Sequence, residues 1–213
     1  MFTGIIEKVC KVVSIQSGTD SMVLTIDLGQ LADGCKIGES IAVNGVCLTV
    51  TKLQGKFASF DVSAETMSKS SMGDLRASSE VNVELAMKAT DRFGGHFVSG
   101  HIDGTAKIKA IERHGNFTDI TFSADTELLE NMVLKGSVAV NGISLTISKL
   151  DQNSFSVAVI PQTLSETTLG RAKIGDNINI ENDIIIKTLK KRLDEILPKG
   201  GPLTADRLRK LGF

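Results

Sequence analysis

The 213-residue sequence has no tryptophan, no tyrosine and a net charge of only −1. With nine phenylalanines as its only aromatic residues, it lacks a stacking platform for single-stranded nucleic acid. The near-zero charge excludes a basic field that would attract nucleic acid or an anionic membrane. No uncharged apolar run is long enough to cross a bilayer, and the opening MFTGIIEKVCK carries Glu7 where a signal peptide would be apolar. These absences indicate a soluble, cytoplasmic protein.

Cysteine and histidine are also scarce. The three cysteines, Cys10, Cys35 and Cys47, are odd in number and do not have metal-ligand spacing, which argues against a disulfide framework or a zinc site. His96 and His101 lie five residues apart, with no carboxylate or thiol at helical spacing, so they do not indicate a metal site either. We therefore expect a protein without a metal or other cofactor.

One stretch of the chain is repeated. SIAVNGVCLTVTKL at residues 40–53 returns as SVAVNGISLTISKL at 137–150, with nine of fourteen positions identical and Cys47 replaced by Ser144. A shift of 97 keeps the two halves in register from Ser40 to Glu84, and a shift of 96 aligns residues 4–15 with 100–111. Two copies at so long a period indicate a duplicated domain rather than a solenoid.

Each copy has the pattern of a small β-domain. Short segments rich in Val, Ile and Thr alternate apolar and polar residues, and turn residues including Asn-Gly separate them. About six strands in about ninety residues favour a closed Greek-key barrel, which leaves no exposed sheet edge. We predict an all-β fold of tandem six-stranded barrels over residues 1–96 and 97–184, followed by a C-terminal α-helix and tail over 185–213.

The period changes after the second copy. DIIIKTLKKRLDEILP places Ile185, Leu189, Leu193 and Ile196 on one face of an amphipathic helix, and Pro198 ends it. The first copy has no counterpart of this helix, so its apolar face has no evident partner within the repeat. Either the helix lies across a barrel or it pairs with copies of itself.

Taken together, these motifs resemble the riboflavin synthase family over residues 1 to about 197. The resemblance rests on MFTGII, the NGVCLTV and NGISLTI pair, GGHFVSGHIDG, KGSVAVNG and IPQTLSETTLG. It implies a transferase that moves a four-carbon unit between two molecules of 6,7-dimethyl-8-ribityllumazine, giving riboflavin and 5-amino-6-(D-ribitylamino)uracil in the last step of riboflavin biosynthesis. It also implies a homotrimer assembled through the C-terminal helix, active sites between neighbouring chains, and lumazine synthase as a further partner.

The resemblance also implies two substrate pockets, whose residues we carry over motif by motif. The first pocket would comprise Gly4, Ile5, Ile6, Cys47, Leu48, Thr49, Asp61, Val62, Ser63, Ala64, Glu65, Thr66, Gly100, His101 and Ile102. The second would comprise Lys135, Ser144, Leu145, Thr146, Ala158, Val159, Ile160, Pro161, Gln162 and Thr163. Phe2 would cover the pocket mouth, although a plain core phenylalanine is the alternative.

Five of these positions are the candidates for catalysis that the resemblance implies: Cys47, His101, Ser144, Thr146 and Asp183. A thiolate at Cys47 could add to the acceptor ring or help to remove a methyl proton, whereas a free cysteine commonly only fills space. His101 suits a general base, and Ser144 would mainly hold its ligand by hydrogen bonding. Asp183 would lie close to the ribityl chain.

Two further positions have a structural and a functional interpretation. His96 is as compatible with a hydrogen-bonded histidine at the domain junction as with a site residue. Lys135 is either a solvated surface lysine or a contact to the ribityl chain. Its match to the family's KG motif favours the contact.

Two other functions compete with catalysis. A lumazine-binding protein without turnover would keep the duplicated barrels, but the joint presence of Cys47, His101, Ser144 and Thr146 argues against it. A flavin reductase would need a following nucleotide-binding domain with a glycine-rich turn, and the sequence contains no such segment.

Overall fold

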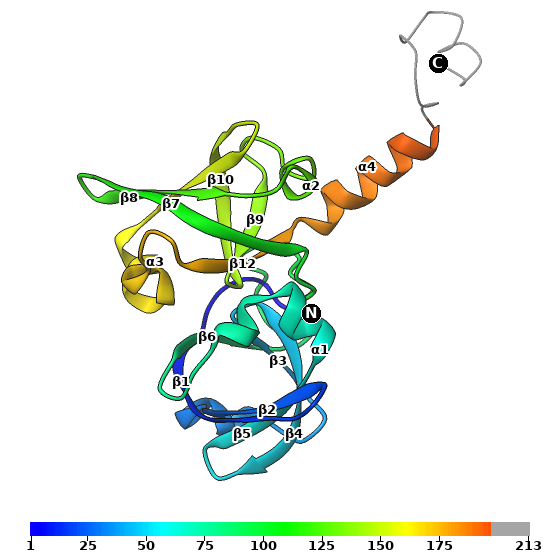
Figure 1. The fold of residues 1–213 in the computed structure, drawn as a ribbon, viewed down its shortest axis with the longest axis vertical. Helices are drawn as coiled ribbons and strands as arrows, with labels where there is room; N and C mark the ends of the chain where they lie inside the picture. Colours follow the sequence, from blue (N-terminus) through cyan, green and yellow to red (C-terminus); the bar gives the residue numbers. More distant parts are fainter. Residues whose placement is uncertain (197–213) are drawn as a thin grey trace, which may run out of the picture.

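The computed structural model describes residues 1–196, which form two closed antiparallel β-barrels and a helix (Figure 1). The strands of the first barrel hydrogen-bond in the order β1-β2-β5-β4-β3-β6, and those of the second repeat it as β7-β8-β11-β10-β9-β12. This confirms the predicted fold class of two six-stranded barrels with a C-terminal helix. The predicted domain boundaries stay a prediction.

The first barrel spans β1 (Lys8–Ser17), β2 (Ser21–Asp27), β3 (Ser40–Val43), β4 (Val46–Gln54), β5 (Phe57–Ser63) and β6 (Glu80–Leu85). The second spans β7 (Gly104–His114), β8 (Phe117–Ser123), β9 (Ser137–Val140), β10 (Ile143–Leu150), β11 (Ser154–Val159) and β12 (Asn177–Asn182). The helical segments are η1 (Gly29–Gly34), α1 (Ala64–Lys69), η2 (Ser71–Asp74), α2 (Thr126–Leu129), α3 (Pro161–Glu166), η3 (Thr168–Arg171) and α4 (Ile184–Ile196).

Alternating side chains build the two barrel interiors. Along β2, Met22, Leu24 and Ile26 are buried and the residues between them are more exposed, as a strand with one core-facing side requires. In the second barrel, the rings of Phe122 and Phe155 stack with their centroids 5.0 Å apart. Each barrel therefore has its own hydrophobic core.

The two Asn-Gly turns bring the barrels together. Asn44 and Asn141 both have φ 46°, and Gly45 and Gly142 both have φ 80°, so both residues of each turn are left-handed, as a type I′ hairpin requires. A β-carbon at Gly45 would lie 2.7 Å from the backbone nitrogen of Gly142, and the reciprocal distance is the same. The barrels therefore meet backbone to backbone, which only glycine allows.

Two buried asparagines connect the barrels around this contact. Asn82 Nδ2 donates to the Asn141 carbonyl, and Asn179 Nδ2 donates to the Asn44 carbonyl, both at 2.9 Å. The Oδ1 atoms of Asn82 and Asn179 accept from backbone N–H groups in η3 and η2, at 2.8 and 2.6 Å. The reciprocal pattern relates the two barrels by an approximate twofold axis.

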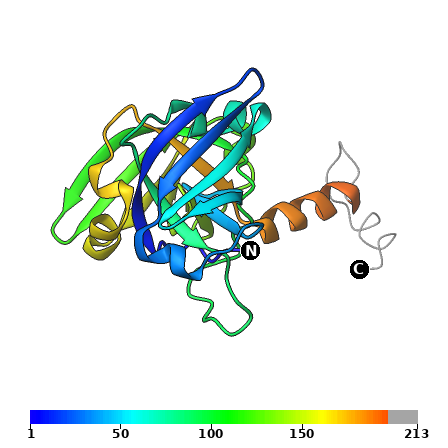
Figure 2. The same ribbon diagram turned by 90° about the horizontal axis from the view of Figure 1, so that it is seen from below.

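Helix α4 extends away from both barrels (Figures 1 and 2). Its predicted apolar stripe is solvent-accessible, with Ile185, Leu189 and Leu193 each at least half exposed. The side chain of Ile196 and residues 197–213, which include Pro198 and the predicted tail, lie outside the described residues. Over residues 1–196, no helix is long and apolar enough to cross a membrane.

The inter-barrel asparagines yield a stability prediction. Asn179→Ala should lower the free energy of unfolding by about 2–4 kcal/mol, because it leaves one buried backbone donor and one buried acceptor unpaired. Chemical denaturation measures the loss, and Asn153→Ala, at an exposed turn position, is the control. Equal stability of the two variants would contradict a structural role for this contact.

Candidate active site

Two short segments cross between the barrels. The segment before β1 passes to the second barrel, where the Ser144 amide donates to the Gly4 carbonyl at 2.8 Å. The segment before β7 passes to the first barrel, where the Cys47 amide donates to the Gly100 carbonyl at 2.9 Å. The side chains of these segments also reach the opposite barrel, because Ile6 packs against the core of the second barrel and Ile102 against the core of the first.

This exchange corrects one grouping from the sequence. Gly4, Ile5 and Ile6 were predicted in the first pocket with Cys47, but Gly4 is hydrogen-bonded to Ser144 of the second. The 96-residue shift aligns the segments with each other, but it cannot say to which barrel each one runs.

Glycine is required where each segment touches its pocket. Gly4 and Gly100 have φ 77° and 84°, a left-handed conformation that favours glycine. A β-carbon at Gly4 would lie 2.7 Å from Ser144 Cβ, and one at Gly100 would overlap Cys47 Cβ. The close approach places each crossing segment directly against the differing residue of the repeat.

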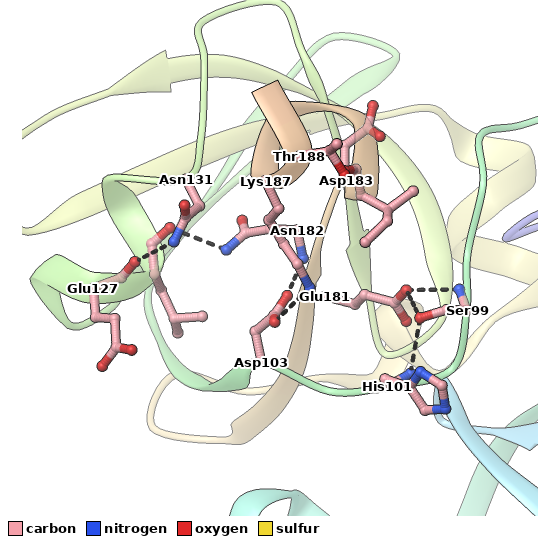
Figure 3. Close-up of polar contacts among 12 residues, drawn as sticks. Ser99, His101, Asp103, Glu127, Asn131, Glu181, Asn182, Asp183, Lys187 and Thr188 are labelled. Atoms are coloured by element: carbon pink, nitrogen blue, oxygen red, sulfur yellow. Dashed lines mark hydrogen bonds and ion pairs between the residues drawn. The ribbon is translucent and has the colours of Figure 1, made fainter. Parts of the chain in front are cut away.

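The first pocket has a volume of about 290 Å³. Its lining consists of Val46, Cys47, Glu65, Thr66, Lys69, Ser70, Gly100, His101 and Ile102. Cys47 is partly buried on β4. His101 is exposed and lies on the crossing segment, close to Ser99 (Figure 3). The structure thus brings the thiol and the histidine that the resemblance nominated into the lining of one pocket, from different parts of the chain.

Other predicted residues of the first pocket lie elsewhere. Leu48 and Val62 point into the barrel core and are at most 5% exposed, so only their backbone can face a ligand. Asp61 lines a separate hollow on the outer barrel wall, with Thr51 and Lys52. Ser63 caps α1 by accepting from the Thr66 amide at 3.2 Å, and Ala64 and Thr49 are exposed.

Ser144, the central residue of the predicted second pocket, has its Oγ 2.7 Å from His96 Nδ1. His96 belongs to the chain between β6 and β7, and Gly95 beside it packs on the Ser144 side chain. The sequence left His96 undecided between a structural and a functional role. The structure places it against the serine that replaces Cys47 in the second copy.

His96 is only 7% exposed, and burial lowers the pKa of its imidazole, although the charge of Asp183 partly opposes this. A neutral ring donates from one nitrogen and accepts at the other. Within residues 1–196, its Nε2 is buried and has no hydrogen-bond partner. Few buried polar atoms in folded proteins lack a hydrogen-bond partner, so this nitrogen distinguishes His96 from an ordinary core residue.

The remaining predicted residues of the second pocket differ in exposure. Ala158, Ile160, Pro161, Gln162, Lys135 and Thr146 are exposed. Val159 is fully buried in the core, whereas Leu145 and Thr163 are partly buried. Lys135 adopts φ 67° in the turn before β9, and its amide donates to the Ile147 carbonyl at 2.9 Å.

Phe2 and two cysteines occupy core positions. Phe2 is fully buried between the barrels, packed with Ala42, Val98 and Ala139, which is the alternative interpretation from the sequence. Cys10 and Cys35 are buried, and burial raises the pKa of the Cys10 thiol to about 11. Among residues 1–196, no group of three or more histidine, cysteine or acidic side chains could hold a metal ion.

The sequence placed His101 in the first pocket with Cys47 but missed the contact between His96 and Ser144. His101 lines the first pocket together with Cys47. The aligned residue is Ile5, in the segment that runs to the second barrel. His96 is hydrogen-bonded to Ser144 and has no counterpart, because residue 96 precedes the aligned part of the repeat. The only sequence signal was the GGH motif, whose small residues allow close approach to Ser144.

Comparison with known proteins agrees with this geometry. The lumazine binding domain family matches the chain twice, at residues 3–86 and 99–183. Its fold is similar to LumP complexed with riboflavin, with a TM-score of 0.79, 23% identity, and coverage of 85% of this chain and 99% of that one. The fold and the two matches define a tandem lumazine-binding protein.

Curated relatives narrow the class. The chain is 44% identical to the riboflavin synthase of Actinobacillus pleuropneumoniae, over 100% of both chains. It is also 44% identical to that of Bacillus subtilis (strain 168), over 91% of this chain and 90% of the relative. The chain belongs to the riboflavin synthase family. It is therefore an enzyme of the transferase class.

The His96 environment predicts a pH dependence of stability. Because its pKa in the folded protein is below the ordinary 6.5, the unfolded chain binds a proton first as the pH falls. The free energy of unfolding should therefore decline below about pH 6.5, until the pH passes the folded pKa.

Denaturation of the parent and of His96→Gln across this range measures the effect, and the variant should show a shallower decline. His114→Gln, at an exposed histidine, should keep the parental slope. If His96→Gln also kept it, His96 would not be buried in its neutral form.

Proposed function

We propose that the two pockets hold the two substrate molecules of the riboflavin synthase reaction, with Cys47 and His101 acting in one and Ser144 and His96 in the other. The reaction moves a four-carbon unit from one 6,7-dimethyl-8-ribityllumazine to a second. The observation that carries the proposal is the reciprocal construction, in which equivalent strands meet a crossing segment but present Cys47 in one pocket and Ser144 in the other.

A repeated site suits a reaction between two copies of one molecule. Pockets with the same backbone recognise the same heterocycle, and opposing them orients the pair. Converting a two-molecule encounter into an oriented contact can lower the barrier by about 7–11 kcal/mol. Duplication followed by local divergence supplies both the likeness that binding needs and the difference that separates donor from acceptor.

The side chains assign distinct roles to the pockets. In the first, a thiolate at Cys47 adds to the acceptor ring or assists proton removal, and His101 accepts a proton from the reacting methyl group. In the second, neutral His96 hydrogen-bonds Ser144 and fixes the direction of its hydroxyl, so that Ser144 holds its ligand by hydrogen bonding. Thr146 is exposed on the same strand and Asp183 lies near His96, so both can contact the second substrate.

Assembly is the second part of the proposal. We propose a homotrimer in which α4 supplies the contacts between chains and each active site combines the first barrel of one chain with the second barrel of its neighbour. The exposed Ile185, Leu189 and Leu193 support it, because an apolar stripe of this kind needs a partner. A cytoplasmic location and lumazine synthase as a partner stay predictions from the resemblance.

Purified protein mixed with the lumazine should form riboflavin without added cofactor, and Cys47→Ser should reduce the single-turnover rate by about 10²–10⁴-fold. Serine keeps the size and hydrogen bonding of cysteine but gives up the easily ionised nucleophile. Riboflavin absorbance measures the rate, and lumazine affinity should be retained.

Ser144→Cys is the mirror control and should reduce turnover less. Parental turnover by Cys47→Ser would show that Cys47 only fills space. Tight lumazine binding by the parent without product would instead favour a binding protein without turnover.

The α4 stripe gives a test of assembly. Replacing both Leu189 and Leu193 by Asp should convert trimers to monomers, because charge would enter an apolar contact. Light scattering measures the mass, and turnover should fall with it. Lys191→Asp, at an exposed position off the stripe, is the control. A fully active monomer would overturn both the trimer and the shared site.

A further inference from the structure

A buried glutamate holds the segment that carries His101. Glu181 is 2% exposed at the end of β12, and its Oε1 accepts from the Ser99 amide at 2.6 Å and the Ser99 hydroxyl at 2.7 Å. Its Oε2 accepts from the Gly100 amide at 2.9 Å. The carboxylate thus fixes the residue whose carbonyl accepts from the Cys47 amide.

The equivalent glutamate of the first barrel does the same for the other segment. Glu84 is 4% exposed and accepts from the Thr3 amide and hydroxyl at 2.6 and 2.8 Å, and from the Gly4 amide at 3.0 Å. Glu84 and Glu181 are related by the 97-residue shift, and Gly4 and Gly100 by the 96-residue shift. Each barrel therefore holds the segment that completes the pocket of the other barrel.

Ion pairing does not explain these carboxylates. Burial is the main cause that raises the pKa of both groups, and the nearby charges that act on them, Glu7 and Asp103, raise it further. No salt bridge to either glutamate occurs among residues 1–196. Burying a charge without an ion-pair partner is costly. The hydrogen bonds that each glutamate accepts offset this cost, and they orient a chain segment.

The far end of the His101 segment is tied to the same place. Asp103 Oδ2 accepts from the Asn182 amide at 2.8 Å, and Asp103 Oδ1 pairs with Lys187 Nζ at 2.7 Å. The His101 amide donates to Ser99 Oγ at 3.3 Å (Figure 3). Both ends of this five-residue segment, Ser99–Asp103, are therefore fixed to the junction of β12 and α4, whereas its middle faces Cys47.

We propose that Glu181 is a positioning residue for the first pocket: by holding Ser99 and Gly100 it keeps His101 beside Cys47, and Glu84 has the same role at Ser144. The assignment of His101 and Cys47 to catalysis rests on the proposed function, but the positioning itself does not. It follows that the geometry around Cys47 of the first barrel is set by a side chain of the second.

Glu181→Gln tests the proposal with little change of volume. The amide nitrogen of glutamine is a donor, so it would face a backbone or hydroxyl donor. The hydrogen bonds to either Ser99 or Gly100 would be lost. Because a misplacement of about 1 Å can cost about 10²-fold in rate, the single-turnover rate should fall about 100-fold. Lumazine affinity should change far less, which separates positioning from a loss of binding.

Alkylation of Cys47 by iodoacetamide, followed by peptide mass spectrometry, reports on the same geometry without requiring catalysis. Release of the segment should speed this reaction several-fold in Glu181→Gln, while buried Cys10 and Cys35 stay slow. Glu84→Gln is the matched control, since it loosens the segment at Ser144 and should leave Cys47 at the parental rate. An unchanged rate in Glu181→Gln, or an equal rise in both variants, would overturn the proposal.

A second variant tests the proposal if Glu181→Gln does not fold. If circular dichroism shows that Glu181→Gln is unfolded, Ser99→Ala decides, because it removes one bond to Glu181 and the acceptor for the His101 amide but keeps the carboxylate. It should speed Cys47 alkylation, and a parental rate would overturn the proposal. A parent that forms no riboflavin would refute the proposed function, while the alkylation rates would still decide the role of Glu181.

Discussion

The backbone contact between Gly45 and Gly142 is the constraint on which the rest of the structure depends. Because nothing larger than hydrogen fits there, the two Asn-Gly turns can approach until Asn82 and Asn179 reach the opposite barrel. The same closeness lets the two crossing segments pair with each other through Phe2 and Val98 and then continue to opposite barrels. Without it, neither segment would reach the pocket that it completes.

The approximate symmetry is strong in the backbone and weak in the side chains. Both pockets receive a glycine carbonyl from a crossing segment, and both segments are held by a buried glutamate. The side chains differ, because Cys47 and His101 line one pocket whereas Ser144 is hydrogen-bonded to His96 at the equivalent place of the second barrel. A reaction between two identical molecules needs this combination, since equal binding and unequal reactivity must come from one repeated framework.

Helix α4 has no counterpart in the first copy of the repeat, and its apolar stripe is left exposed. The helix still bears on the site, because its first turns follow Glu181 directly and Lys187 pairs with Asp103. The helix for which we propose a role in assembly therefore begins where the His101 segment is held, at the junction of β12 and α4.

Local patterns in the sequence determined the barrels and their turns, and the resemblance to a known family nominated the site residues. Alternation predicted the strands, Asn-Gly predicted tight hairpin turns, and the position that differs between the two copies drew attention to Cys47 and Ser144. It did not assign Gly4–Ile6 to its pocket, pair His96 with Ser144, or separate core-facing Leu48 and Val62 from site residues. Those outcomes were decided by tertiary structure, because a crossing segment is placed by contacts with residues far away in the chain. Pattern and period carry no information about such distant partners.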